Sequence, residues 1–370
     1  MTIIHSGFDT IIFAVKGAAK PKTLKYLDIH KENAVKAQRD IPVRFKNNTL
    51  KGLIAPTGTS GGYAYILKFQ GDIGHVIQLK RNLDRNGWNA HVKIRAFALA
   101  TYGWNEAIAH VFSNLAAIGF SEHGISLNRV DYAMDFLNAS LSLNPSHIVA
   151  HSHTKKAAHK LEINAHSRGQ AYETITAGKM PNRQVIIYDK RREVTEKHNH
   201  VWYEFWGIDP TDITQTVHRV EIRLGKNELL KREIRTLDDF RTKVIAAMTH
   251  AAEVVRYVTP REGDQNISRW PNHTLWDHVQ AHVRAHVLRN PNYVDPARVK
   301  HVLRAQKGRE CKKQVLGNMA NLSVFLDMEP EKMKEQMVKL WSEEFSEIQA
   351  NDAHTFWKSR AKTQDRFSFL

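Results

Sequence analysis

Apolar and polar residues alternate along the chain with two periods, near two and near 3.6 residues, which distinguish strands from helices. The predicted elements are a strand at 8–16, a helix at 20–40, a hairpin within 52–69, a strand at 91–101, a helix at 104–118, a strand at 127–137, a helix at 144–160, strands at 171–177 and 183–190, a strand at 217–225, and a long helix at 226–258. Gly119 follows the second helix and Pro260 ends the long one, as expected of C-cap and helix-breaking residues.

This order of elements predicts an α+β fold, in which a mostly antiparallel sheet is covered on one face by helices. Residues 90–260 would form the core, and residues 1–89 an N-terminal strand and hairpin segment that packs on the core or belongs to it. Beyond Pro260 the pattern is helical and rich in His, Trp and Arg, with prolines that divide it into short pieces. We therefore expect residues 261–370 to form a separate helical module.

Charge points to the class of partner. The 370 residues include 54 Lys and Arg against 38 Asp and Glu, a formal net charge of +16. Such an excess favours a polyanionic partner, with nucleic acid ahead of an anionic membrane surface. We expect no membrane span, because no run of about 18 apolar residues occurs.

The single cysteine, Cys311, excludes an intrachain disulfide and a cysteine-rich zinc site. It fits a reducing compartment, and cytoplasm is the expected location. The N-terminal stretch MTIIHSGFDTIIFAVKG has no basic region before its apolar residues, so we interpret it as a strand rather than a signal peptide.

Two predicted strands contain the same three-residue pattern, arginine, valine and an acidic residue. The acid is Asp131 in NRVDYAMDFL and Glu221 in HRVEIRL. If the strands are neighbours, alternation places both carboxylates on one face, where they could hold a divalent cation, Mg²⁺ or Mn²⁺. Asp135 ranks second, since it lies about 13 Å from Asp131 at about 3.3 Å per residue. The alternative is that these acids pair with Arg129 and Arg219 on a solvated sheet face.

The stretch QVIIYDKRREV places Tyr188 at the end of an apolar strand, directly before Lys190, Arg191 and Arg192. A phenol with a pKa near 10 is a weak nucleophile, and neighbouring cations or a metal that favour phenolate would activate it toward a phosphodiester. The same cations would hold a DNA backbone. The alternative is a packing tyrosine, and Tyr172 is the main rival nucleophile.

The ordered set VKIRAFALATYGW, NRVDYAMDFL, TAGKMPNRQVIIYDKRREV and HRVEIRLG resembles the replication initiation factor family of plasmids and phages, often called Rep_trans. The resemblance covers about 90–260 and implies a nicking-endonuclease-like core. It implies that a tyrosine attacks one DNA strand at an origin and becomes joined to the 5′ phosphate, with a divalent metal assisting. On this chain the nucleophile falls on Tyr188 and the metal carboxylates on Asp131 and Glu221.

The function expected from the resemblance is origin-specific nicking that starts rolling-circle replication. One alternative is a conjugative relaxase of the same chemistry, and another is a non-catalytic DNA-binding regulator. Further candidate partners are a host helicase and a second copy of the chain in a homodimer.

Two histidine patterns need separate interpretation. The sequence HSH at 151–153 imitates a metal motif, but its predicted helical setting does not direct both rings to one ion. In HTLWDHVQAHVRAHVL, His278, His282 and His286 recur every four residues beside a valine stripe, with Arg284 on the same segment. We interpret this segment as a basic helix that meets DNA; an amphipathic packing helix or a metal site is the alternative.

Overall fold

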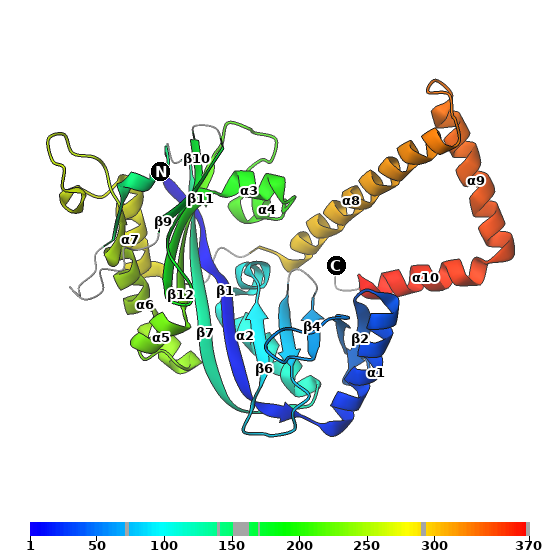
Figure 1. Ribbon diagram of the computed structural model, residues 1–370, viewed down its shortest axis with the longest axis horizontal. Helices are drawn as coiled ribbons and strands as arrows, with labels where there is room; N and C mark the ends of the chain where they lie inside the picture. Colours follow the sequence, from blue (N-terminus) through cyan, green and yellow to red (C-terminus); the bar gives the residue numbers. More distant parts are fainter. Residues whose placement is uncertain (71–73, 139–140, 151–162, 169–170, 290–293, 368–370) are drawn as a thin grey trace. The chain divides into compact units, whose positions relative to one another are not determined.

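Eleven strands of the described residues form one sheet in the computed structural model, in the order β2-β3-β4-β5-β6-β1-β7-β12-β11-β10-β9 (Figure 1). Their bounds are β1 Thr2–Ala19, β2 Ile41–Phe45, β3 Leu50–Ile54, β4 Tyr65–Phe69, β5 His75–Leu79, β6 Trp88–Ile94, β7 Phe120–Leu137, β9 Ile163–Arg168, β10 Ala171–Gly178, β11 Arg183–Asp189 and β12 Val217–Gly225. The structure describes residues 1–370 except 71–73, 139–140, 151–162, 169–170, 290–293 and 368–370.

All neighbouring strands of the sheet pair antiparallel, which confirms the α+β prediction with a large antiparallel sheet. A second sheet pairs β8 Ile148–Ala150 with β13 Val255–Tyr257. The helices are α1 Pro21–Ala37, α2 Ala96–Ala117, α3 Lys190–Glu196, α4 Trp202–Trp206, α5 Lys226–Lys231, α6 Leu237–Val254, α7 Thr274–His286, α8 Pro296–Phe325, α9 Met333–Asn351 and α10 Ala353–Arg366. No helix in the described part of the chain has the length and apolar character needed to cross a membrane.

The order of the strands is duplicated about the central pair β1 and β7, each of which has 18 residues. Outward from β1 the sheet continues through β6, β5, β4, β3 and β2, and outward from β7 through β12, β11, β10 and β9. In each half the last strand along the chain pairs with the long strand and precedes a helix: β6 pairs with β1 before α2, and β12 pairs with β7 before α5. We call β1 to β6 the N-terminal half of the sheet, and β7 with β9 to β12 the C-terminal half.

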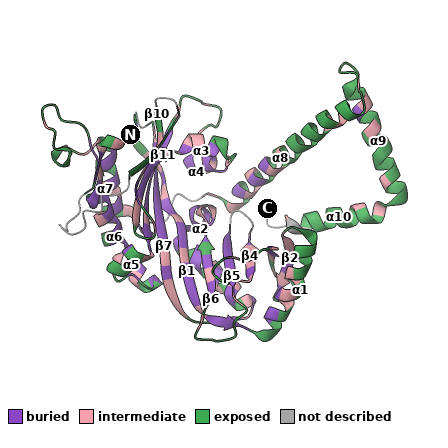
Figure 2. Cartoon of the chain, in the orientation of Figure 1, coloured by how far each residue is buried: buried purple, intermediate pink, exposed green. Residues whose placement is uncertain are grey.

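Helices α2, α6 and α7 cover one face of the sheet, which we call the helical face. The Phe8 ring of β1 lies 6.4 Å from Trp104 of α2 and 5.1 Å from Phe240 of α6, between ring centroids. Tyr132 of β7 shares this face, and its hydroxyl lies 3.1 Å from Nε2 of His282 of α7. Burial of these rings and of the valines and isoleucines around them stabilises the sheet (Figure 2).

The opposite face, which we call the polar face, carries Asp131, Asp135, Arg219 and Glu221. The sequence predicted that helices cover only one face. However, all four of these polar residues are buried, and Trp202 and Trp206 of α4 lie over part of this face. The polar side of the C-terminal half is therefore not a solvated surface.

Several predicted boundaries are wrong. Residues 96–101 begin α2 rather than continue a strand, since AFALAT is rich in strong helix formers. The predicted helix at 226–258 is instead α5, α6 and the strand β13, with a capping box of Thr236 and Asp239 starting α6. The segment 144–150 forms a 3₁₀ turn and β8 rather than a helix, and the rest of that prediction lies outside the described residues.

The chain divides into two compact units, Met1–Asp295 and Pro296–Leu370. The expected boundary near residue 260 is therefore displaced, because α7 packs within the first unit. Trp276 of α7 is buried, and its Nε1 donates a 2.7 Å hydrogen bond to the carbonyl of Ala252 in α6. The second unit consists of α8, α9 and α10, whose residues are mostly exposed (Figure 2).

Candidate active site

The polar face of three adjacent strands brings together residues that are far apart in sequence. Tyr188 of β11 lies opposite Arg219 of β12, and Arg219 lies opposite Asp135 of β7. Arg223 lies opposite Asp131, so Asp131 and Glu221 are diagonal neighbours on one face. The predicted adjacency of these two carboxylates is thus present.

Asp135 and Arg219 form a buried ion pair at the centre of this face. Arg219 donates from Nε to Oδ1 at 2.6 Å and from Nη2 to Oδ2 at 2.7 Å, and Trp206 Nε1 donates to Oδ2 at 2.7 Å. Burial acts to raise the pKa of Asp135, but Arg219 outweighs it, and the pKa lies below its usual value. Asp135, the second-ranked metal ligand, has both oxygens engaged as an anchor for Arg219.

Asp131 and Glu221 are each held by an arginine two residues away on the same strand. Arg129 donates to both Asp131 oxygens, at 2.8 and 2.6 Å, and Arg223 donates to both Glu221 oxygens, at 2.7 and 3.1 Å. Asp131 therefore has the predicted partner Arg129, but Glu221 is paired with Arg223 rather than Arg219.

Burial raises the pKa of Asp131 to about 7, and the nearby Glu221 acts in the same direction against Arg129. A cation beside the pair would relieve this cost of ionisation. Among the described residues no three His, Cys, Asp or Glu side chains cluster as a metal site. Two carboxylates nevertheless fit Mg²⁺ or Mn²⁺, since Mg²⁺ commonly uses one or two protein carboxylates together with substrate phosphates and water.

Tyr188 lies at the end of β11, beside the buried Lys190, whose Nζ is 5.7 Å from the phenol ring centroid. Burial raises the pKa of Tyr188 well above its usual value, with Arg219 opposing and Glu221 reinforcing the shift. In the protein without substrate or metal, burial therefore outweighs the neighbouring cation that favours phenolate. The rival nucleophile Tyr172 of β10 is exposed, whereas Tyr132 is buried on the helical face.

Each of the three cations after Tyr188 has a partner within the protein. Lys190 donates to Glu193 at 2.5 Å, and its Nζ lies 4.9 Å from the centroid of the Trp202 ring. Arg191 donates to the carbonyl of Gln215, and Arg192 pairs with Glu173 at 2.5 Å. Asp189 caps α3 by accepting from the backbone N–H of Arg192 at 2.9 Å.

Sequence reasoning missed three residues of this site. Asp9 accepts a 2.8 Å hydrogen bond from Arg219 Nη1. Asp9 lies on β1 where the register of its pairing with β7 shifts. Trp202 lies against the Arg219 guanidinium, 4.3 Å from its ring centroid, and Trp206 hydrogen-bonds Asp135. An aspartate inside the apolar run FDTIIF is the one sequence signal that could have indicated Asp9.

The histidine segment forms α7, and the stripe of Val279, Val283 and the C-cap residue Val287 is fully buried. This packing matches the amphipathic alternative. Arg284 is exposed and pairs with Glu253 of α6 at 2.9 Å, on the helical side of the sheet, so it is not part of the polar face. The HSH sequence at 151–153 lies outside the described residues.

Comparison with protein-family models and with curated proteins finds no match. Among solved structures, a rolling circle replication initiator protein from Geobacillus stearothermophilus aligns with a TM-score of 0.42 and 16% identity, over 77% of this chain and 98% of that one. Methanococcus jannaschii TBP aligns with a TM-score of 0.24 and 11% identity, over 64% and 98%. The first is a weak resemblance at the level of the fold.

Proposed function

We propose that this protein nicks and rejoins one DNA strand at a replication origin through Tyr188, and so starts rolling-circle replication. One observation carries the proposal. A phenol and two carboxylates, from β11, β7 and β12, share one face beside a fully buried arginine. That set contains a nucleophile for a phosphodiester, ligands for a hard cation and a fixed positive charge.

In the proposed reaction the Tyr188 oxygen attacks phosphorus, and an O–P bond forms as the P–O3′ bond breaks. The phenol loses its proton, and the released 3′ oxygen gains one. Rejoining is the reverse, with the 3′ hydroxyl attacking the phosphotyrosyl ester. Arg219, held by Asp135 and Asp9, is fixed in place before substrate arrives, so it stabilises developing negative charge without reorganising.

Asp131 and Glu221 would hold the divalent cation. When bound, Mg²⁺ or Mn²⁺ supplies Lewis-acid stabilisation of the phosphate and lowers the cost of ionising a nearby phenol. Since Tyr188 is held protonated in the free protein, we expect nicking to depend on added cation.

The test is a covalent adduct. We expect wild-type protein, incubated with Mn²⁺ and a single-stranded oligonucleotide from the origin of its own replicon, to give a protein-DNA band that survives denaturation. Tyr188→Phe should bind the same oligonucleotide and give no band, because only the attacking oxygen is removed. An adduct on Tyr188→Phe would show that another residue attacks.

A non-catalytic DNA-binding regulator is the second candidate. It is favoured by the pairing of both carboxylates with arginine and by the protonated state of Tyr188. Absence of any adduct with the cognate origin, under conditions where binding is measured, would select this reading. A conjugative relaxase would use the same residues, and the origin that supports nicking separates it from a replication initiator.

A further inference from the structure

The polar face continues across the N-terminal half of the sheet, where its character changes from buried acid–arginine pairs to half-buried and exposed cations. In this half the helical face holds fully buried residues such as Phe13, Val92 and Leu67. Alternate positions point the other way, and the cations among them are half-buried or exposed, whereas Ala14, Leu53 and Val76 between them are buried. The cations at these outward positions are Lys16, Arg44, Lys51, Lys68, Lys80 and Lys93. We call this set, with His91 and Tyr63, the basic face.

The basic face is continuous with the candidate active site through strand pairing. Thr10 of β1 lies opposite Asp131 of β7. Ile12, the next residue on that side, lies opposite Arg129 on one flank and Lys93 of β6 on the other. The site and the basic face are thus two parts of one side of one sheet.

Three lysines of the basic face carry charge that no described acid neutralises. Asp40 pairs with Lys68 at 2.5 Å. By contrast, Lys16, Lys51 and Lys93 form no ion pair with any other residue that the structure describes. A plain solvated sheet face would usually pair its cations with acids, whereas these three lysines have no acidic partner among the residues that the structure describes. Electrostatic complementarity therefore points to a polyanion.

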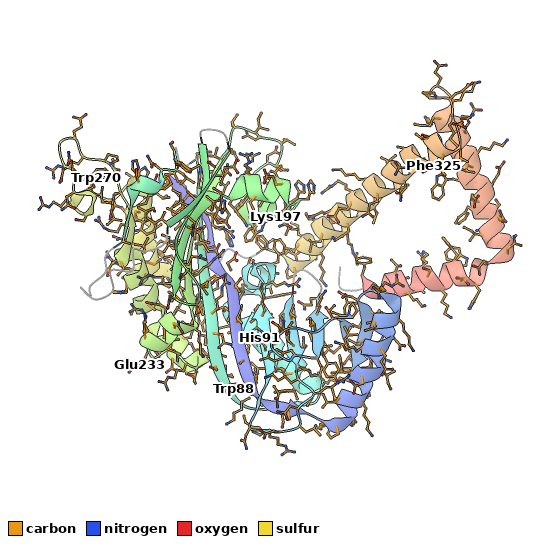
Figure 3. All side chains as sticks on the ribbon, viewed as in Figure 1. Trp88, His91, Lys197, Glu233, Trp270 and Phe325 are labelled. Atoms are coloured by element: carbon orange, nitrogen blue, oxygen red, sulfur yellow. The ribbon has the colours of Figure 1, made fainter. Side chains whose placement is uncertain are left out.

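Aromatic rings lie among these cations. Tyr63, from the loop between β3 and β4, is 5.6 Å from His91 between ring centroids, and Nζ of Lys80 is 5.0 Å from the Tyr63 centroid. His91 is on the strand β6 (Figure 3). Proteins that hold single-stranded nucleic acid combine cations that follow the backbone with aromatic rings on which bases stack. Duplex DNA offers phosphates but keeps its base faces stacked.

We propose that the basic face binds single-stranded DNA and leads it across the sheet to Tyr188. The proposal rests on the proposed function, because it names the path of that enzyme's substrate. Six strand spacings separate β4 from β11. At about 4.8 Å per spacing the path measured along the sheet is about 29 Å.

The test measures binding of a fluorescent 20-nucleotide oligo(dT) by anisotropy over a range of KCl concentrations. We expect Lys16→Ala/Lys80→Ala/Lys93→Ala to weaken binding at least tenfold at low salt. The slope of log affinity against log salt should fall by about 2, since each phosphate contact to a single strand contributes about 0.7. The matched control removes Lys22, Lys25 and Lys36, three exposed lysines of α1, and should change affinity less than about twofold.

α1 is a suitable control because it packs on the helical side, where Tyr26 contacts Phe45. Equal weakening by both triple variants would overturn the proposal, since binding would then follow net charge rather than this face. Unchanged binding by the first triple variant would overturn it as well. Thermal melts check that each variant is folded.

A second readout distinguishes single-stranded from duplex DNA. Tyr63→Ala should weaken oligo(dT) binding about tenfold with an unchanged salt slope, since it removes stacking rather than charge. Equal loss on a duplex of the same length, or no loss on oligo(dT), would overturn the single-strand assignment. Tyr188→Phe should bind oligo(dT) as wild type does, so absence of a covalent adduct would reject the proposed nicking without rejecting this surface.

Discussion

Arg219 and Asp135 lie opposite each other on β12 and β7 and share two hydrogen bonds, at 2.6 and 2.7 Å, with both side chains fully buried. An ion pair without solvent must have its remaining polar atoms satisfied. Here Asp9 and Trp206 do so, from β1 and α4. The pair therefore fixes the relative positions of four elements around Tyr188.

Asp135→Asn should destabilise the protein by about 3 to 5 kcal/mol, because it leaves the Arg219 charge buried without its main partner. Urea denaturation followed by tryptophan fluorescence measures the change. The matched control is Asp238→Asn, which breaks an exposed pair with Arg241 and should change stability by about 1 kcal/mol or less. Similar losses for the two variants would contradict the anchoring role of Asp135.

Asp131→Asn and Glu221→Gln should each reduce Mn²⁺-dependent nicking at least 100-fold and leave oligonucleotide binding within about twofold. Each amide keeps the shape of the side chain but removes the charge that a hard cation requires. The assay is cleavage of a labelled single-stranded origin as Mn²⁺ is varied. Full activity of both variants with a chelator present would reject these two residues as metal ligands.

Tyr172→Phe should form the covalent adduct at the wild-type rate, because this exposed tyrosine of β10 is separate from the carboxylates of the polar face. Tyr188→Phe should match wild type in melting temperature, since no described residue hydrogen-bonds the Tyr188 hydroxyl. Peptide mapping of the adduct identifies the attacking residue directly. A phosphotyrosyl peptide containing Tyr172 would exchange the two assignments.

His282→Gln should make stability less sensitive to acid. Burial lowers the pKa of His282 to about 4, with His286 and Arg289 acting in the same direction. Between pH about 6.5 and 4 the unfolded chain binds a proton here that the native protein does not, so stability present above pH 6.5 is lost as the pH falls.

Comparison of urea unfolding at pH 7 and pH 5 should show a loss that is smaller in His282→Gln than in wild type by about 1 kcal/mol, because the half-buried imidazole is partly screened by solvent. Glutamine retains an acceptor for the Tyr132 hydroxyl, which limits the effect on packing. His278→Gln, exposed on the same helix, is the control and should follow wild type. Identical pH dependence in all three proteins would contradict the lowered pKa.

Local pattern was sufficient to identify most strands and the shared face of Asp131 and Glu221. Successive side chains of a strand point to opposite faces of the sheet. In each of the two Arg-Val-acid patterns the valine faces the core, so both acids point to the other face. Even the fold class followed from the order of strands and helices. Boundaries failed where a local signal such as the capping box at Thr236 was overlooked within a longer helical period.

Only the tertiary structure decided what that shared face is. Arg219 meets Asp9 across 210 residues of chain, and Trp202 and Trp206 cover the ion pair from a helix inserted between β11 and β12. Burial depends on such distant contacts, and burial sets the pKa. Sequence therefore indicated an activated Tyr188 and open cations, whereas the fold gives a protonated phenol, paired cations and a basic face on the other half of the sheet. Desolvation by distant residues opposes the charged form of a side chain, and no local pattern contains it.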